Sequence, residues 1–143
     1  MGRIVTHRHE IRVEFHHVDM MQVAHNSEYF RWFERGRLEL FEEVFPMQWM
    51  IDNRIGAPVV ANRCEYTWPA VYGDTLVVTT RHRLLDSYAG RFDFDHSIVR
   101  PRDRRELASG RTSVTLVDLA RYRLVKEIEP AVWARYQRLG ERP

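Results

Sequence analysis

Cysteine is nearly absent from this chain of 143 residues, in which Cys64 is the only one. A single cysteine excludes a disulfide framework within the chain and is typical of a protein in a reducing compartment. Long apolar runs are also lacking: nowhere do about 18 apolar residues follow one another, and the first residues are polar and charged. We therefore expect no membrane span, no signal peptide and a cytoplasmic location.

An excess of charge of one sign is lacking as well. The 22 basic and 20 acidic residues leave a net charge of +2, and the basic residues are scattered, so we expect no nucleic-acid partner. With 44% hydrophobic and 29% charged residues, the composition is that of an ordinary globular protein. The length fits one domain over residues 1–143.

Two periodic patterns open the chain. Apolar and polar residues alternate over residues 9–15, which predicts a half-buried strand. Over residues 27–43 apolar side chains recur every three or four positions, which predicts one long helix. Asn26 and Ser27 are residue types that cap the start of a helix well. Gly36 removes a side chain from the apolar stripe, so we expect another element to approach this helix closely.

Strand patterns joined by tight connections dominate the rest of the chain. We expect strands over residues 58–68, 74–85, 88–100 and 105–119. Residues 45–56 indicate a short helical turn and a loop, and residues 129–143 a short terminal helix. One strand, one long helix and four further strands predict an α+β fold, in which a five-stranded antiparallel sheet wraps around one long central helix.

Two segments resemble a known family. The segment VDMMQVAHNSEYFRWFERGRLEL, residues 18–40, resembles the signature of the hotdog-fold acyl-CoA thioesterases. Within them it is most similar to the 4-hydroxybenzoyl-CoA thioesterase-like group, which includes short-chain enzymes associated with the Tol-Pal system. That signature has an Asp, a Tyr ten residues later and an E-R-x-R-x-E run, here Asp19, Tyr29 and residues 34–39. Residues 56–78 match the family's next two strands, and the resemblance extends to about residue 119.

The resemblance implies a fold, a substrate and an assembly. The implied fold is the hotdog fold, a sheet curled around a central helix. The implied substrate is an acyl-CoA, with no cofactor. The family also implies a homodimer or homotetramer in which the sheets of two subunits join edge to edge and the active sites lie at the subunit interface.

Hydrolysis of a thioester needs a group that polarises the carbonyl and a nucleophile or a base. The resemblance implies that Asp19 is the catalytic carboxylate, acting either as the nucleophile or as a general base toward water. The N–H groups near Asn26 and Ser27 are our candidates for the oxyanion hole, because the start of a helix presents unpaired N–H groups and a positive dipole end. The alternative for Asp19 is a loop residue that hydrogen-bonds nearby amides.

Further residues are candidates for substrate contacts. Gln22 stands where family members usually have Gly, so it is the main departure from the pattern beside the thioester. His25 is a second candidate, although it can equally be a polar residue satisfied at the helix start. Tyr29 is a possible pocket wall, although a core position is more common for such a residue.

A cluster of arginines is a candidate for the phosphates of CoA. These residues are Arg100, Arg102, Arg104 and Arg105. They lie close together around a turn-like stretch, and local positive charge attracts phosphate groups. The alternative is a solvated hairpin tip.

The histidines near Asp19 raise the question of a metal site, but we do not expect one. His17, Asp19 and His25 can converge, but no HxxxH or HExxH spacing is present on a helix. His96 faces the same side of its strand as apolar residues and is most simply a core histidine. An enoyl-CoA hydratase of the hotdog type is disfavoured, because its D-x-N-P-x-H motif is missing. A non-catalytic hotdog protein that binds acyl-CoA or acyl-carrier protein stays open.

Overall fold

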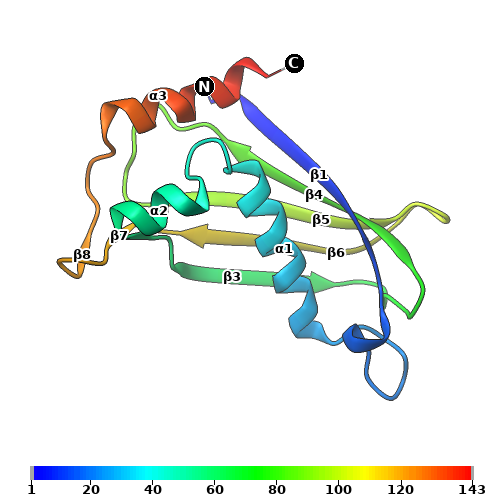
Figure 1. Ribbon diagram of the computed structural model, residues 1–143. Helices are drawn as coiled ribbons and strands as arrows, with labels where there is room; N and C mark the ends of the chain where they lie inside the picture. Colours follow the sequence, from blue (N-terminus) through cyan, green and yellow to red (C-terminus); the bar gives the residue numbers. More distant parts are fainter. Residues whose placement is uncertain (1, 143) are drawn as a thin grey trace.

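A five-stranded antiparallel sheet forms the centre of the computed structural model, which describes residues 2–142 (Figure 1). Its strands are β1 (Ile4–Arg12), β3 (Val59–Tyr66), β4 (Thr75–Arg83), β5 (Phe92–Arg100) and β6 (Arg105–Val114). In space they follow the order β1-β4-β5-β6-β3, and each neighbouring pair is antiparallel. The predicted α+β fold with a five-stranded antiparallel sheet is confirmed.

Strand β1 differs from the prediction in its position. It begins at Ile4 and ends at Arg12, whereas the alternating pattern predicted residues 9–15. The inward-facing positions before residue 9 are Val5 and His7, and the polar His7 interrupts the apolar alternation on which the prediction relied.

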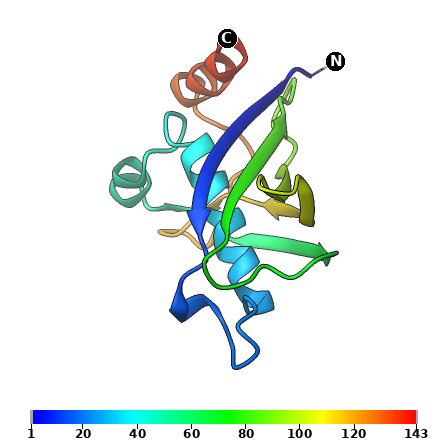
Figure 2. The ribbon, with the colours of Figure 1, turned by 90° about the vertical axis from the view of Figure 1, so that its right-hand side faces the viewer.

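Helix α1 (Asn26–Leu40) lies across one face of the sheet, and β1 and β4 curve past it (Figure 2). It begins one residue before the predicted span of residues 27–43 and ends three residues before the end of that span. A side-chain carbon on Gly36 would overlap the Oγ1 atom of Thr80 on β4. The predicted close approach at this glycine is therefore confirmed.

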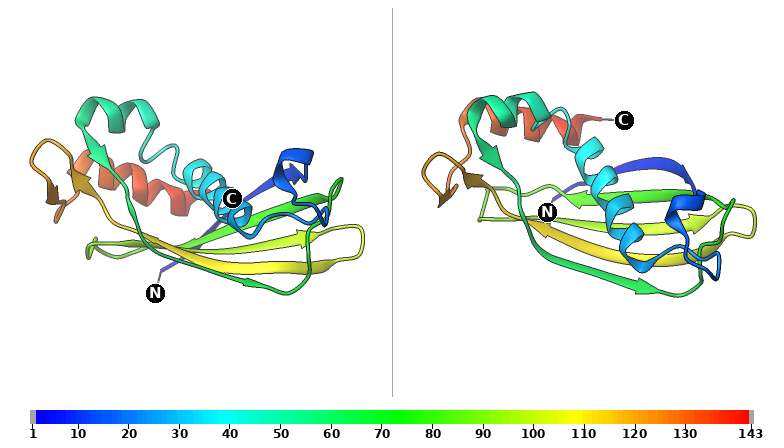
Figure 3. Two further views of the ribbon diagram at one scale, coloured as in Figure 1. Left: turned by 90° about the horizontal axis from the view of Figure 1, so that it is seen from below. Right: turned by 60° about the horizontal axis from the view of Figure 1, so that its bottom comes forward.

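Two further α-helices, α2 (Met47–Asn53) and α3 (Pro130–Arg138), lie within the helical turn predicted for residues 45–56 and the terminal helix predicted for residues 129–143. Residues 2–142 therefore form three α-helices, which corrects the expectation of a sheet wrapped around one long central helix. All three helices lie on the same side of the sheet (Figure 3). The physical reason is that α1 covers only part of this long sheet. Val132 and Tyr136 of α3 bury the remaining apolar surface, in one core cluster with Phe92 of β5.

The remaining elements are short. They are β2 (Ile55–Gly56), β7 (Val117–Asp118) and β8 (Arg123–Leu124), which form a small second sheet, and the 3-10 helices η1 (Phe15–His17) and η2 (Leu139–Glu141). The strand expected over residues 105–119 is thus broken after β6, because β7 pairs with β2 instead. Among residues 2–142, no helix has the length and apolar character needed to cross a membrane.

Candidate active site

The loop that carries Asp19 is a tight hairpin between η1 and α1. Val18 pairs with Ala24 across it, and the carbonyl of Asp19 accepts a hydrogen bond of 2.9 Å from the N–H of Gln22. One carboxylate oxygen of Asp19, Oδ1, accepts a bond of 2.8 Å from the N–H of Met21. Within residues 2–142, the other carboxylate oxygen has no hydrogen-bond partner, and the side chain is exposed. Asp19 therefore has a fixed position and one oxygen available for chemistry.

Gln22 shapes this hairpin through its backbone. Its φ of 62° lies in the left-handed region, where a glycine is favoured because it has no Cβ atom. Its carbonyl also accepts a bond of 3.0 Å from the N–H of Tyr72, which joins the hairpin to the turn before β4. Gln22 thus adopts the backbone conformation that the usual glycine would favour, and its exposed side chain remains only a predicted substrate contact.

The start of α1 offers one free donor. His25 is the N-cap, and its Nδ1 atom accepts from the N–H of Ser27 at 3.2 Å and lies 2.7 Å from the Ser27 hydroxyl. Because a backbone N–H can only donate, this cap requires Nδ1 to be unprotonated. Within the described chain, the N–H of Asn26 has no acceptor. Of the two predicted oxyanion donors, Ser27 is engaged by His25, and Asn26 is free.

Tyr29 belongs to the buried core beneath this junction. Only 2% of its surface is exposed, and burial raises the pKa of its hydroxyl. That hydroxyl accepts a hydrogen bond of 3.2 Å from the N–H of Ala70. Its ring packs against Trp32 and Tyr66, with centroids 5.0 and 4.8 Å away. Tyr29 therefore fastens the segment before β4 to the helix, and its predicted contact with substrate stays a prediction.

Arg100, the first of the predicted phosphate ligands, is engaged by carboxylates. It donates to Asp74 at 3.0 Å and to Asp103 at 2.8 Å, and only 8% of its side chain is exposed. The hydrogen bond that Arg100 donates to Asp103 is the main cause that raises the pKa of Arg100. The guanidinium therefore holds the β5–β6 hairpin to the turn before β4, and it is not free for a phosphate.

The other three arginines are exposed on the same hairpin. The guanidinium of Arg102 lies 3.5 Å from Asp74, and that of Arg105 stacks over the ring of Trp68 at 3.9 Å. Arg104 occupies the turn with a φ of 57°. This hairpin and the loop of Asp19 lie at the same end of the sheet (Figure 1). The two predicted groups are thus brought to one end of the molecule, with the turn before β4 in contact with both.

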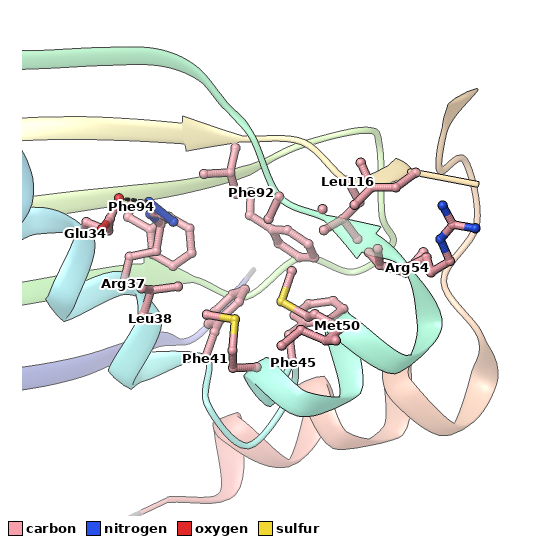
Figure 4. A pocket seen from close by; sticks show the side chains of 17 residues that line it. Glu34, Arg37, Leu38, Phe41, Phe45, Met50, Arg54, Phe92, Phe94 and Leu116 are labelled. Atoms are coloured by element: carbon pink, nitrogen blue, oxygen red, sulfur yellow. Dashed lines mark ion pairs between the residues drawn. The ribbon is translucent and has the colours of Figure 1, made fainter. Parts of the chain in front are cut away.

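An apolar cavity of about 640 Å³ runs along the second half of α1. Apolar side chains form most of its wall, among them Leu38, Phe41, Phe45, Met50, Phe92 and Leu116. The ion pair of Glu34 with Arg37 lies at one end, and Arg54 at the other (Figure 4). A smaller hollow of about 120 Å³ on the β3 side of α1 shares Glu34 and Arg37 with it. Both hollows therefore lie against α1, with Glu34 and Arg37 in the wall of each.

Residues 13–136 match the family described as the thioesterase-like superfamily. The chain belongs to this superfamily. It is similar to the long-chain acyl-CoA thioesterase FadM of Escherichia coli (strain K12), with 31% identity over 81 residues, which are 57% of this chain and 61% of the relative. The chain therefore matches less than two thirds of the length of that relative.

Solved structures share the fold of this thioesterase-like chain. A 1,4-dihydroxy-2-naphthoyl-CoA thioesterase from Synechocystis has a TM-score of 0.76 and 20% identity, covering 92% of this chain and 94% of the other. A DHNA-CoA thioesterase from Staphylococcus aureus has a TM-score of 0.81 and 19% identity, covering 95% and 91%. These likenesses show a hotdog-like fold.

Sequence reasoning missed a row of polar side chains that crosses the sheet beneath α1 of this thioesterase-like chain. His96 lies 3.0 Å from the Thr80 hydroxyl and 3.1 Å from the Thr112 hydroxyl, which in turn donates to Asn62. Its ring stacks on Phe33 at 4.3 Å. Burial is the main cause that lowers the pKa of His96 to about 3. The prediction that His96 is a core histidine is confirmed.

Sequence reasoning also missed the cavity. Its wall combines α1, α2, β5 and residues near β7, which are far apart along the chain. No local pattern could have indicated that these elements leave a space between them.

Proposed function

We propose that the protein hydrolyses acyl-CoA thioesters to a free acid and CoA. The supporting observation is the junction of loop and helix, where the exposed carboxylate of Asp19 precedes a helix start whose Asn26 N–H has no partner among residues 2–142. Membership of the thioesterase-like superfamily supports the same chemistry. A carboxylate and a free oxyanion donor are the two groups that hydrolysis of a thioester requires.

In the proposed reaction, the carbonyl oxygen of the thioester points to the start of α1. The free oxygen of Asp19 attacks the carbonyl carbon, or it takes a proton from a water molecule that attacks. The negative charge that develops on the carbonyl oxygen is stabilised by the Asn26 N–H and the helix dipole, an effect of about 3 kcal/mol for one donor. The C–S bond breaks and CoA leaves as the thiolate. Where Asp19 attacks directly, water then cleaves the anhydride that it has formed with the acyl group and restores the carboxylate, so in both routes water supplies the oxygen of the free acid.

The cavity supports the proposal that the substrate carries a long acyl chain. Glu34, at its near end, is eight residues beyond Asn26, which corresponds to about 12 Å along a helix. A short acyl group held at the start of α1 would not reach the apolar wall, whereas a long chain could fill it. Each methylene buried there contributes about 0.8 kcal/mol, roughly a fourfold gain in binding. The relative FadM is named a long-chain acyl-CoA thioesterase, which agrees with this preference.

The exposed arginines support a proposed binding position for the CoA part of the substrate. Arg102, Arg104 and Arg105 lie on the β5–β6 hairpin, at the end of the sheet that carries Asp19. We propose that they attract the nucleotide phosphates, while Arg100 holds the hairpin in shape through its two carboxylates.

The uncovered edge of the sheet supports a homodimer. Strand β3 is exposed along nearly its whole length, including Val59, Val60 and Tyr66. Exposed edge strands with apolar side chains favour pairing with another strand. We propose that two copies join along β3, and a homotetramer would need a second interface. Sedimentation should give a dimer for the wild type and a monomer for Val60→Lys; equal masses for both proteins would contradict this interface.

A panel of saturated acyl-CoAs from four to eighteen carbons tests the proposed activity, with release of the CoA thiol as the readout. We expect hydrolysis that increases with chain length up to a plateau. If none of the panel is cleaved while the protein binds the same esters in calorimetry, the protein is a non-catalytic acyl-CoA-binding module and the proposal fails.

A further inference from the structure

Three metal-binding residue types meet between β1 and α1. Side chains two apart on a strand point to the same face, so His7 and His9 of β1 both face the helix. Glu39 faces them from the last turn of α1. One ligand atom of each residue lies within 4.8 Å of the others, and Nε2 of His7 is 2.8 Å from Oε1 of Glu39.

His9 makes this group more than a surface ion pair. Only 8% of its surface is exposed, yet neither ring nitrogen has a hydrogen-bond partner within residues 2–142. Buried polar groups in folded proteins nearly always have a partner, so a buried imidazole with two unpaired nitrogens needs an explanation. A neutral imidazole keeps a lone pair on one ring nitrogen, and in His9 no described hydrogen-bond donor engages it.

The surroundings of Glu39 suit a ligand. Its second oxygen, Oε2, accepts a hydrogen bond of 3.0 Å from Arg35, which leaves Oε1 directed at the histidines. Such supporting hydrogen bonds are typical of carboxylate ligands to metals.

We propose that His7, His9 and Glu39 bind a divalent transition-metal ion of the Zn²⁺ class, with water as the fourth ligand. Two imidazoles and one carboxylate match the donors that Zn²⁺ and Co²⁺ prefer, whereas Mg²⁺ and Ca²⁺ prefer oxygen alone. Glu39 is thirteen residues beyond Asn26, about 20 Å along the helix, so this site is separate from the proposed thioester site. The ion would join the edge strand β1 to α1.

No metal site was expected from the sequence. That expectation weighed His17, Asp19 and His25, which form a different group. The signal for the present site is the H-x-H pattern of residues 7–9, which becomes informative once β1 is known to begin at Ile4. The site is independent of the proposed hydrolysis.

Metal binding by the full chain tests the proposal directly. The protein is stripped with EDTA, desalted, and titrated with Zn²⁺ or Co²⁺. We expect about one Zn²⁺ per chain, a visible Co²⁺ spectrum of the tetrahedral type, and a melting temperature about 8 °C higher at a hundredfold excess over the dissociation constant. His7→Gln should lose the ion, whereas the control His16→Gln, on the exposed η1, should keep it.

Circular dichroism of each metal-free variant establishes that it is folded before the titration. The proposal is overturned if the wild type fails to bind either ion at micromolar concentration. It is also overturned if folded His7→Gln binds as much metal as the wild type, because the ion would then lie elsewhere. Thioesterase activity does not enter either outcome, so failure of the metal site leaves the proposed hydrolysis untouched.

Discussion

Acid is expected to destabilise the protein through its buried histidines, and His96 allows the effect to be measured for one residue. Burial, assisted by the nearby charges of Arg37 and His9, lowers the pKa of His96 to about 3. In the unfolded chain the ring titrates with a pKa of about 6.5. Between these two values the unfolded state binds more protons, so the free energy of unfolding falls as the pH falls through this window.

The size of the effect follows from the same values. At pH 5.0 the native ring is still neutral, whereas the unfolded ring is protonated. The pH lies about 1.5 units below the unfolded pKa, and each unit corresponds to about 1.4 kcal/mol, so His96 alone costs about 2 kcal/mol. Above pH 6.5 this loss is absent. Other buried histidines, such as His82, whose pKa is also lowered mainly by burial, add to the total loss.

His96→Gln separates this contribution from the others. Glutamine does not titrate, but it can still hydrogen-bond the hydroxyls of Thr80 and Thr112. Urea unfolding at pH 7.5 and 5.0, in EDTA, gives the loss of stability for each protein. The loss should be about 2 kcal/mol smaller for His96→Gln than for the wild type. The control His16→Gln, which is exposed, should show the wild-type loss. Equal losses in wild type and His96→Gln would refute the reasoning.

Three further predictions concern the loop, the cavity and the hairpin. Gln22→Gly should relieve the strain of the left-handed backbone, raise the free energy of unfolding by about 1 kcal/mol and raise the melting temperature by about 3 °C in calorimetry. A melting temperature below that of the wild type would contradict the strain. Ala57→Phe, on the cavity wall, should move the preferred acyl chain to shorter lengths in a thiol-release assay, whereas Ala131→Phe on α3 should not. Arg100→Met should cost about 3 kcal/mol in urea unfolding, because it removes the closer and more buried of the two guanidinium groups that pair with the buried carboxylate of Asp74; a neutral result would return Arg100 to the candidates for phosphate binding.

Local patterns were sufficient for the main elements of the fold. The strand β5 and the helix α1 repeat their apolar residues with the period of their own geometry, so a single segment carries the information. The strands β3 and β4 were predictable from β-branched and aromatic residues between turn signals. The close approach at Gly36 was also predictable, because a glycine within an apolar stripe has few other uses. The first half of β1 was not predicted, since His7 occupies an inward position where an apolar residue was expected.

The candidate site was predictable in its order along the chain but not in its arrangement. The resemblance placed Asp19 and the start of α1 next to each other in sequence. It could not indicate that the hairpin of Asp19 pairs with the turn before β4, or that Arg100 is engaged by Asp74, because both contacts join segments far apart in the chain. Long-range packing decides such details, as it decides the cavity.

The carboxylate of Asp19 is the centre of the proposed function, and one comparison tests it most directly. Steady-state release of CoA thiol from the best acyl-CoA is measured for wild type, Asp19→Asn and the control Asp86→Asn, which is exposed in the loop after β4. We predict that Asp19→Asn lowers kcat by at least about a hundredfold while the control keeps the wild-type value. A wild-type kcat in folded Asp19→Asn would contradict the assignment of Asp19 as the catalytic carboxylate.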